Sequence, residues 1–251
     1  MDYKTITVKK DGAIGLLTLN RPERLNAINF PMRDELKDFF TACCDDLETR
    51  VLVMTGAGRG FCSGLDMKDA GIINPQGGYS PKQAYEAQRS YSDIILLMRR
   101  CPQPIIGAIN GPAAGVGFSF ALACDVRMAS PEAKFSAAYI NIGVGGADMG
   151  SSWFFPRAVG TANAARYLLT GDLFDANEAL RIGMIQTIVE KDKLLEQSMK
   201  LAAVMVSKSP LGLNLTKEAL DLNMGGRTLE DAIRLEDRNQ AMCIAQLLLP
   251  K

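Results

Sequence analysis

The sequence contains no histidine, and this absence removes several classes of catalytic site. None of the 251 residues can supply the imidazole of a Ser-His or Cys-His pair, a histidine general base or the usual ligands of catalytic zinc. Proton transfer must therefore be carried out by carboxylates, lysine, tyrosine, cysteine or water. A serine nucleophile of the Ser-His type, for example at Ser119, is excluded.

Net charge is also missing, because Lys plus Arg and Asp plus Glu both number 28. Without a field of one sign, DNA, RNA and anionic membrane surfaces are not expected partners. No apolar run approaches the roughly 20 residues that a membrane-spanning helix needs. The first residues, Met1 to Lys4, lack the basic-then-apolar layout of a signal peptide. We therefore expect a cytoplasmic protein.

Cysteine is present, but not in a pattern that indicates disulfides or a metal site. The six cysteines are scattered among apolar residues in a chain too large to need cross-links. We interpret them as reduced, buried small hydrophobic residues. They are Cys43, Cys44, Cys62, Cys101, Cys124 and Cys243.

Strand-like and helix-like patterns alternate along the first half of the chain. Asp11-Gly12 lies between two strand-like runs and indicates a hairpin. The expected strands are residues 5–9, 14–19, 51–55, 104–109 and 126–129, and the expected helices are 32–47 and 118–124. Repeated ββα units of this kind predict a layered α/β architecture.

After residue 150 the sequence becomes mainly helical. Asp175 followed by Glu178 resembles a capping box at a helix start. Helices are expected at 161–169, 175–182, 192–207, 210–222 and 228–249, with a short strand at 186–189. We divide the chain into a core at 1–191 and a C-terminal helical region at 192–251. That region should dock on the core or on a neighbouring subunit.

Two glycine-rich segments, residues 56–68 and 110–117, follow buried strands and lead into helices. Helix starts after such loops present unpaired N–H groups, which bind anions or a developing oxyanion. Neither segment has the spacing of a phosphate loop or a dinucleotide fingerprint. The plain alternative is that the glycines only permit tight turns. A third glycine-rich loop, residues 143–150, carries one carboxylate, Asp148.

Three successive motifs resemble the signatures of the crotonase superfamily, in the enoyl-CoA hydratase/isomerase family. They are the segments Asn20–Ala27, Gly60–Asp66 and Asn110–Asp125. Shorter matches, among them Ala133–Phe135 and Leu169–Gly171, extend the resemblance over nearly the whole chain.

The resemblance implies a spiral of ββα units with a C-terminal helical trimerisation region. It also implies an acyl-CoA substrate and a homotrimer or a dimer of trimers. The CoA thioester is the substrate, so no cofactor and no metal are expected. By position, the backbone N–H groups of Leu65 and Val116 would form an oxyanion hole.

The same resemblance assigns substrate binding to residues around these two donors. Arg24 and Lys68 would approach the phosphates and ribose of CoA, and Ala27 would line the adenine pocket through its backbone. Ordinary solvated charges remain the alternative for the two cations. The predicted substrate-binding residues are Arg24, Ala27, Ser63, Gly64, Asp66, Lys68, Gly115, Gly117 and Tyr139.

The sequence departs from the hydratases of this family where they place two glutamates, because Ser119 and Tyr139 stand at those positions. The two-glutamate hydration mechanism therefore does not transfer. Asp148 is similar to the aspartate of single-carboxylate isomerases of the family and to the nucleophile of haloaryl-CoA dehalogenases. We predict Asp148 as the principal acid/base. The alternative is an N-cap on the helix containing Ser152. For Tyr139, a hydrogen bond to substrate and simple filling of the acyl pocket both remain open.

These observations predict an acyl-CoA enzyme of lipid metabolism that stabilises a thioester enolate, with isomerisation favoured over hydration. The alternatives are an enoyl-CoA hydratase, a non-catalytic acyl-CoA-binding homologue, and nucleophilic attack by Asp148 on an aryl-CoA. The leucines from Leu247 to Leu249 are expected to pack against the core or a neighbouring subunit.

Overall fold

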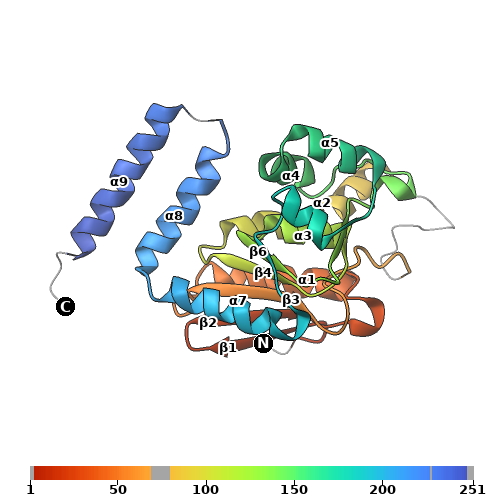
Figure 1. Cartoon of the computed structure of the whole chain (residues 1–251), viewed down its shortest axis with the longest axis horizontal. Helices are drawn as coiled ribbons and strands as arrows, with labels where there is room; N and C mark the ends of the chain where they lie inside the picture. The colour runs from red at the N-terminus through yellow and green to blue at the C-terminus, as the bar shows by residue number, and fades with distance from the viewer. Residues whose placement is uncertain (1–2, 69–79, 227, 248–251) are drawn as a thin grey trace.

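The computed structural model describes residues 3–68, 80–226 and 228–247. Its centre is a six-stranded sheet in which β1 is antiparallel to β2 and every other neighbouring pair is parallel (Figure 1). In sheet order the strands are β1 (Ile6–Asp11), β2 (Ile14–Leu19), β3 (Val51–Gly56), β4 (Ile105–Ile109), β6 (Val126–Ala129) and β9 (Thr187–Ile188). A smaller sheet contains β5 (Ala113–Ala114), β7 (Lys134–Ser136) and β8 (Phe174–Asp175). The predicted hairpin and α/β architecture are confirmed.

The helices surround this sheet and extend beyond it. Two short 3-10 helices, Pro22–Arg24 and Ile140–Ile142, lie in loops beside the site described below. The α-helices are α1 (Phe30–Cys43), α2 (Pro81–Arg100), α3 (Val116–Ala123), α4 (Ser151–Val159), α5 (Thr161–Thr170), α6 (Ala176–Arg181), α7 (Lys191–Val206), α8 (Pro210–Asn223) and α9 (Leu229–Leu247).

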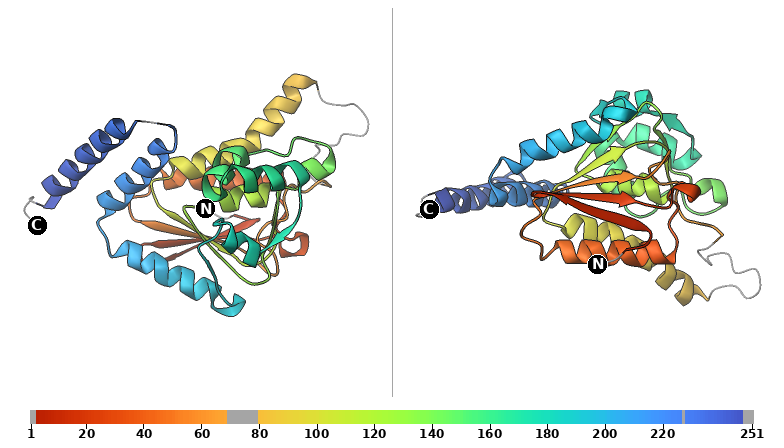
Figure 2. Two further views of the ribbon diagram at one scale, coloured as in Figure 1. Left: turned by 45° about the horizontal axis from the view of Figure 1, so that its top comes forward. Right: turned by 90° about the horizontal axis from the view of Figure 1, so that it is seen from below.

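Strand β3 is buried on both faces because helices cover both sides of the sheet. Its side chains alternate, as the pleat requires. Val51 and Val53 pack in one cluster with Leu194 of α7, while Leu52 and Met54 belong to the larger core on the opposite face. Figure 2 shows α7 and α1 on opposite faces of the sheet. The sheet is thus the fixed layer from which the glycine-rich loops emerge.

Helix α1 is shorter than its apolar pattern predicts. It begins after Asn29, whose side chain accepts a hydrogen bond from the Met32 N–H, and it ends at Cys43. Leu47, which the pattern placed on the buried face, is 92% exposed. Leu47 continues the 3–4 spacing of the apolar residues by chance, because it lies beyond the last turn of α1.

Helix α2 is absent from the predicted elements, although its sequence carries clear signals. Ser80 and Gln83 form a reciprocal capping box at its start, followed by a proline in the first turn. Its buried residues recur at helical spacing: Tyr91, Ile94, Ile95 and Met98. The helix lies beside α1 and α3, next to the predicted active site.

The predicted C-terminal helical region begins with α7. This helix packs on β2, β3, β4 and β6, and so it docks on the core. Helices α8 and α9 lie side by side and extend away from the sheet (Figure 1). The predicted packing of Leu247 to Leu249 concerns side chains outside the described residues.

A largely buried cluster of charged side chains ties α8 to the core. The Lys217 side chain is only 5% exposed, and its Nζ donates to the Gln103 carbonyl at 2.8 Å and lies 3.2 Å from Asp125 Oδ2. Arg99 of α2 pairs with Asp125 at 2.8 Å and with Asp221 of α8. Because buried Lys217 and the partly buried charges around it are paired, α8 is held in a defined position against the C-terminal end of α2.

The cysteines are free, as predicted, but they are not all buried. Cys43, Cys62, Cys101 and Cys124 are buried, whereas Cys44 is exposed and Cys243 is partly exposed. The prediction of six buried cysteines is therefore wrong for these two. Among the described residues, no helix is long and apolar enough to span a membrane.

Candidate active site

The first predicted oxyanion donor lies on a segment held like a strand beside residue 28. Ile28 donates its N–H to the Gly64 carbonyl and accepts from the Asp66 N–H, both at 2.8 Å. In a parallel bridge of this kind, the residue between the two contacts directs its own N–H to the opposite side. That residue is Leu65, and its N–H has no hydrogen-bond acceptor within the described part of the chain.

The second predicted donor is the first N–H of helix α3. Val116 occupies the first helical position, where no intrahelical acceptor exists, and Gly115 before it supplies no side-chain cap. The carbonyl of Pro112 already accepts from the N–H groups of Phe61 and Cys62. Across residues 3–68, 80–226 and 228–247, the Val116 N–H has no acceptor. This N–H is therefore available to an external oxyanion.

The two donor segments touch, and glycine makes this approach possible. Gly64 has φ +104°, and a Cβ there would lie 3.1 Å from the Ala114 carbonyl oxygen and 3.8 Å from Cα of Gly115. A Cβ on Gly117 would lie 2.0 Å from the Cys62 carbonyl oxygen. The predicted binding residues Gly64, Gly115 and Gly117 thus bring two backbone segments together.

Asp148 lies in the loop before α4 and is half-buried. Its Oδ1 accepts from the Met149 N–H at 2.7 Å and from Gln88 Nε2 of α2 at 2.6 Å. Burial raises the pKa of this carboxyl, and it outweighs the two hydrogen bonds, which act to lower the pKa. A raised pKa makes the carboxylate a stronger base than an exposed aspartate.

The alternative role of Asp148 as an N-cap is not supported. The N-cap of α4 is Gly150, and no side chain caps this helix. Instead, the Asp148 backbone contacts Ser151, whose N–H donates to the Asp148 carbonyl at 2.9 Å and whose Oγ accepts from the Asp148 N–H. The carboxylate is therefore available for other chemistry.

Replacing Gln88 is expected to move the acidic limb of the pH profile. Gln88→Ala removes a donor that favours the ionised form, so the pKa of Asp148 should rise. The acidic limb of kcat/KM should then shift to higher pH, and Gln88→Glu should shift it further by adding a like charge. Rate profiles of the three proteins between pH 4 and 9 measure this. Superimposable profiles would show that Gln88 does not act on the titrating group.

Ser119 and Tyr139, the two residues predicted to replace the hydratase glutamates, contact each other. Ser119 Oγ lies 2.5 Å from Tyr139 Oη, and both residues are buried. Tyr139 also donates to the Gly115 carbonyl at 2.6 Å, and Ser119 donates to the Asp148 carbonyl at 3.0 Å. Burial raises the pKa of Tyr139, which keeps it neutral. Both hydroxyls are therefore engaged within the protein.

The residues predicted to bind CoA gather around an ion pair. Arg21 Nη2 lies 3.0 Å from Asp66 Oδ2, and Arg24 Nε lies 3.7 Å from the same oxygen. The Lys68 N–H donates to Asp66 Oδ1 at 3.2 Å, while the Lys68 side chain is exposed. Burial opposes ionisation of Asp66, but these hydrogen bonds and the charges of Arg21 and Arg24 hold its pKa below the ordinary value. The carboxylate fixes the loop between the cations.

Ala27 and Ser63 lie next to this ion pair. The Ala27 N–H donates to the Arg24 carbonyl at 3.0 Å, and its carbonyl accepts from Arg21 Nη1 at 2.5 Å. The Ser63 N–H donates to the Leu25 carbonyl at 3.0 Å. Segments 21–28 and 63–68 therefore form one surface, as the prediction requires. Arg21 was not among the predicted residues, although it belongs to the first motif.

Cys62 lies on the same segment, and burial raises the pKa of its thiol to about 12. A thiol that stays protonated is a poor nucleophile. The packing role predicted from its surroundings is therefore consistent with its environment.

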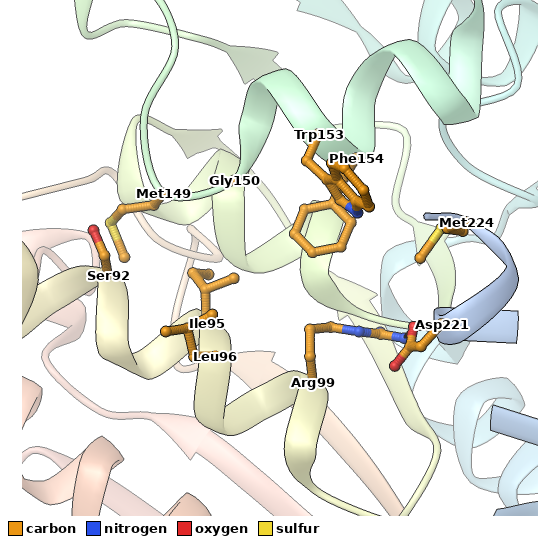
Figure 3. A pocket seen from close by; sticks show the side chains of 10 residues that line it. All are labelled: Ser92, Ile95, Leu96, Arg99, Met149, Gly150, Trp153, Phe154, Asp221 and Met224. Atoms are coloured by element: carbon orange, nitrogen blue, oxygen red, sulfur yellow. Dashed lines mark hydrogen bonds and ion pairs between the residues drawn. The ribbon is translucent and has the colours of Figure 1, made fainter. Parts of the chain in front are cut away.

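A largely apolar cavity of about 500 Å³ extends from the Asp148 loop between α2, α4 and α8. Figure 3 shows Met149 and Ser92 at one end and the ion pair of Arg99 and Asp221 at the other. Ser92 lies one helical turn after Gln88, so the cavity begins beside the contact that α2 makes with Asp148. Helix α2, which was absent from the predicted elements, supplies both the hydrogen-bond partner of Asp148 and a wall of this cavity.

In the part of the chain that the structure describes, two backbone N–H groups without acceptors lie on touching segments, near a loop with a half-buried carboxylate. This combination is characteristic of enzymes that stabilise an oxyanion. The chain belongs to the enoyl-CoA hydratase/isomerase family, whose sequence model matches residues 9–248. It is therefore a crotonase-fold enzyme of that family, and membership implies an acyl-CoA substrate.

Individual relatives are similar over most of the chain. A probable enoyl-CoA hydratase of Mycobacterium leprae is 42% identical, over 94% of this chain and 79% of the relative. The 1,2-epoxyphenylacetyl-CoA isomerase of Escherichia coli is 36% identical, over 88% of this chain and 82% of the relative. The crystal structure of a probable enoyl-CoA hydratase/isomerase from Mycobacterium abscessus superimposes with a TM-score of 0.88 at 38% identity, covering 95% of this chain and 90% of that one.

Proposed function

We propose that this protein is an acyl-CoA isomerase of the family, in which Asp148 is the single acid/base and the N–H groups of Leu65 and Val116 form the oxyanion hole. The observation that carries the proposal is the contact between Ser119 and Tyr139. Both hydroxyls are buried and engaged within the protein where hydratases hold water with two glutamates. Isomerisation, in contrast, is a reaction that one carboxylate, Asp148, can perform alone.

With a 3-enoyl-CoA, the Asp148 carboxylate removes a proton from C2. The electron pair moves onto the thioester oxygen and gives a dienolate, to which Leu65 and Val116 donate their N–H groups. The protonated Asp148 returns the proton to C4, and the product is the 2-enoyl-CoA. No water is consumed. The raised pKa of Asp148 brings it closer to that of the carbon acid, which favours removal of the proton from C2.

The substrate would lie across both halves of the site. We assign the CoA phosphates and ribose to Arg24 and Lys68 and the adenine to the backbone around Ala27. Ser63, Gly64, Asp66, Gly115 and Gly117 are the backbone and loop contacts of the same site. The apolar cavity beside Met149 would take the acyl chain, because its volume of about 500 Å³ lies within the range of small-molecule sites.

A homotrimer or a dimer of trimers remains part of the proposal. The support is the apolar surface of the hairpin formed by α8 and α9. Its exposed apolar residues are Leu220, Leu229, Ile233, Met242 and Ile244. Such a surface is costly in water and favours an intersubunit contact.

Hydration of a 2-enoyl-CoA is the second candidate, because the M. leprae relative bears the name of a probable hydratase. A hydratase would need a water molecule held opposite the base. With the hydroxyls of Ser119 and Tyr139 engaged, that role has no assigned side chain. The isomerase name of the E. coli relative supports the first candidate.

Mass spectrometry in heavy water tests the two candidates directly. The protein is incubated separately with a 3-enoyl-CoA and a 2-enoyl-CoA. We expect double-bond migration and no added water. Deuterium should appear at C2 or C4 to the extent that the proton on Asp148 exchanges with heavy water before it is returned. A product heavier by one heavy-water molecule would support hydration and contradict the isomerase. Binding of both thioesters with no change in either would favour the non-catalytic binding homologue.

A further inference from the structure

The contact between Ser119 and Tyr139 joins two peptide units that belong to the proposed chemistry. Tyr139 Oη donates to the carbonyl of Gly115 at 2.6 Å, and Ser119 Oγ donates to the carbonyl of Asp148 at 3.0 Å. The two oxygens lie 2.5 Å apart, so Ser119 shares its one proton between Tyr139 and Asp148. The pair thus forms a buried bridge from the start of α3 to the loop before α4.

Each carbonyl in this bridge belongs to a peptide unit whose N–H faces the site. A trans peptide is planar, so the direction of its carbonyl fixes the opposite direction of its N–H. The Gly115 carbonyl shares its plane with the Val116 N–H, which is the proposed oxyanion donor. The Ser119 N–H of α3 also donates to this carbonyl, at 3.1 Å. Tyr139 therefore helps to set the direction of that donor through the far side of the same peptide.

The second peptide unit, between Asp148 and Met149, is held in the same way. The Asp148 carbonyl shares its plane with the Met149 N–H, which donates to Asp148 Oδ1 at 2.7 Å. Met149 has φ +45°, a conformation that non-glycine residues rarely adopt. A hydrogen bond from Ser119 to this peptide helps to hold it in place, and the peptide in turn holds the carboxylate.

We infer that Ser119 and Tyr139 are positioning residues that hold the oxyanion donor Val116 and the base Asp148 in one fixed relative orientation. The inference rests on the proposed function and assigns these side chains no contact with the reacting atoms. In this chain the two residues do not hold a water molecule, as the hydratase glutamates do. Instead they align the oxyanion donor with the base. A buried hydroxyl pair suits this role because neither partner can exchange its contact for solvent.

The test uses Tyr139→Phe, Ser119→Ala and the double variant, with Tyr167→Phe as the matched control. Tyr167 is also buried, and its hydroxyl donates to Glu178 at 2.7 Å, away from the bridge. The control variant therefore loses a comparable hydrogen bond. The readouts are kcat, KM, the melting temperature and the infrared carbonyl band of a bound saturated acyl-CoA labelled with ¹³C at the thioester carbonyl. That band moves when N–H groups polarise the carbonyl.

We expect Tyr139→Phe to lower kcat about tenfold or more while KM changes little. The reason is that a misaligned Val116 N–H stabilises the oxyanion less well. The carbonyl band should return toward its position in free acyl-CoA. Ser119→Ala should lower kcat and move the acidic limb of the pH profile upward. The double variant should lose little beyond the larger single loss, because the two residues act through one bridge.

An unchanged carbonyl band in Tyr139→Phe, with kcat no lower than in Tyr167→Phe, would overturn the inference. Losses that multiply in the double variant would also overturn it. If the wild-type protein itself leaves the carbonyl band unshifted, the oxyanion hole and with it the proposed function are contradicted first. If the carbonyl band is shifted in the wild-type protein and the variants do not change it, only the positioning role of Ser119 and Tyr139 is contradicted.

Discussion

Asp148→Asn is expected to lower kcat for double-bond migration by at least about 100-fold, the range lost with a general acid/base. Asparagine keeps the size of the side chain, and its Oδ1 can still accept from Met149 and Gln88. The fold and the binding of acyl-CoA should therefore be preserved. Turnover assays and equilibrium binding of an unreactive acyl-CoA measure the two effects separately.

Asp172→Asn is the control, because Asp172 is exposed and lies outside the site. It should leave both turnover and binding at the wild-type level. The assignment of Asp148 would be wrong if its amide variant kept turnover within a few-fold of wild type. Loss of binding together with turnover would instead make Asp148 a binding residue. A covalent adduct on Asp148 with an aryl-CoA would favour the dehalogenase-like alternative.

Gly117→Ala should have the second largest effect, and it should act on both activity and stability. Its Cβ would meet the Cys62 carbonyl oxygen at 2.0 Å, so α3 and the segment carrying Leu65 must move apart. Overpacking of this kind costs about 1–3 kcal/mol of folding free energy. Displacement of an oxyanion donor costs about 10²–10³ in kcat. Urea unfolding measures the loss of stability. The kcat of the variant, measured under urea-free conditions in which it is folded, gives the loss of activity.

Gly212→Ala is the matched control, because both glycines are helical. The Cβ at position 212 would lie no closer than 3.4 Å to its nearest neighbour, Ser209 Cβ. Alanine is favoured over glycine in a helix by up to about 1 kcal/mol, so this variant should be neutral or slightly stabilised. Full activity in Gly117→Ala would mean that the close approach of the two segments is not needed for catalysis.

Without histidine, this site depends on backbone geometry more than on side-chain chemistry. The two proposed donors are N–H groups, and the hydroxyls of Ser119 and Tyr139 act on carbonyls rather than on substrate. The carboxylate that remains is held by one N–H and one amide. Such a site suits enolate chemistry, where charge develops on one oxygen and a single proton moves.

Local pattern in the sequence was sufficient for the elements whose hydrogen bonds are local. Asp11-Gly12 determines the hairpin of β1 and β2, and Asp175 caps α6 by accepting from the Glu178 N–H. The buried strand β3 follows from its continuous apolar run. The family resemblance proposes the donors at Leu65 and Val116. Of these, Val116 stands at a helix start, whereas Leu65 lies on a strand-like segment beside Ile28. The capping box and the helical spacing of α2 are equally local signals.

Tertiary structure alone decided how these elements meet. Gln88 and Asp148 are 60 residues apart, and only the packing of α2 beside the core brings them to 2.6 Å. Ser119 and Tyr139 pair only because α3 and the loop after β7 fold onto each other. Leu47 fits the pattern of α1 but lies beyond its end, since the chain must turn into β3. Periodicity reports hydrogen bonds three or four residues apart, whereas side-chain contacts between layers depend on how whole surfaces pack.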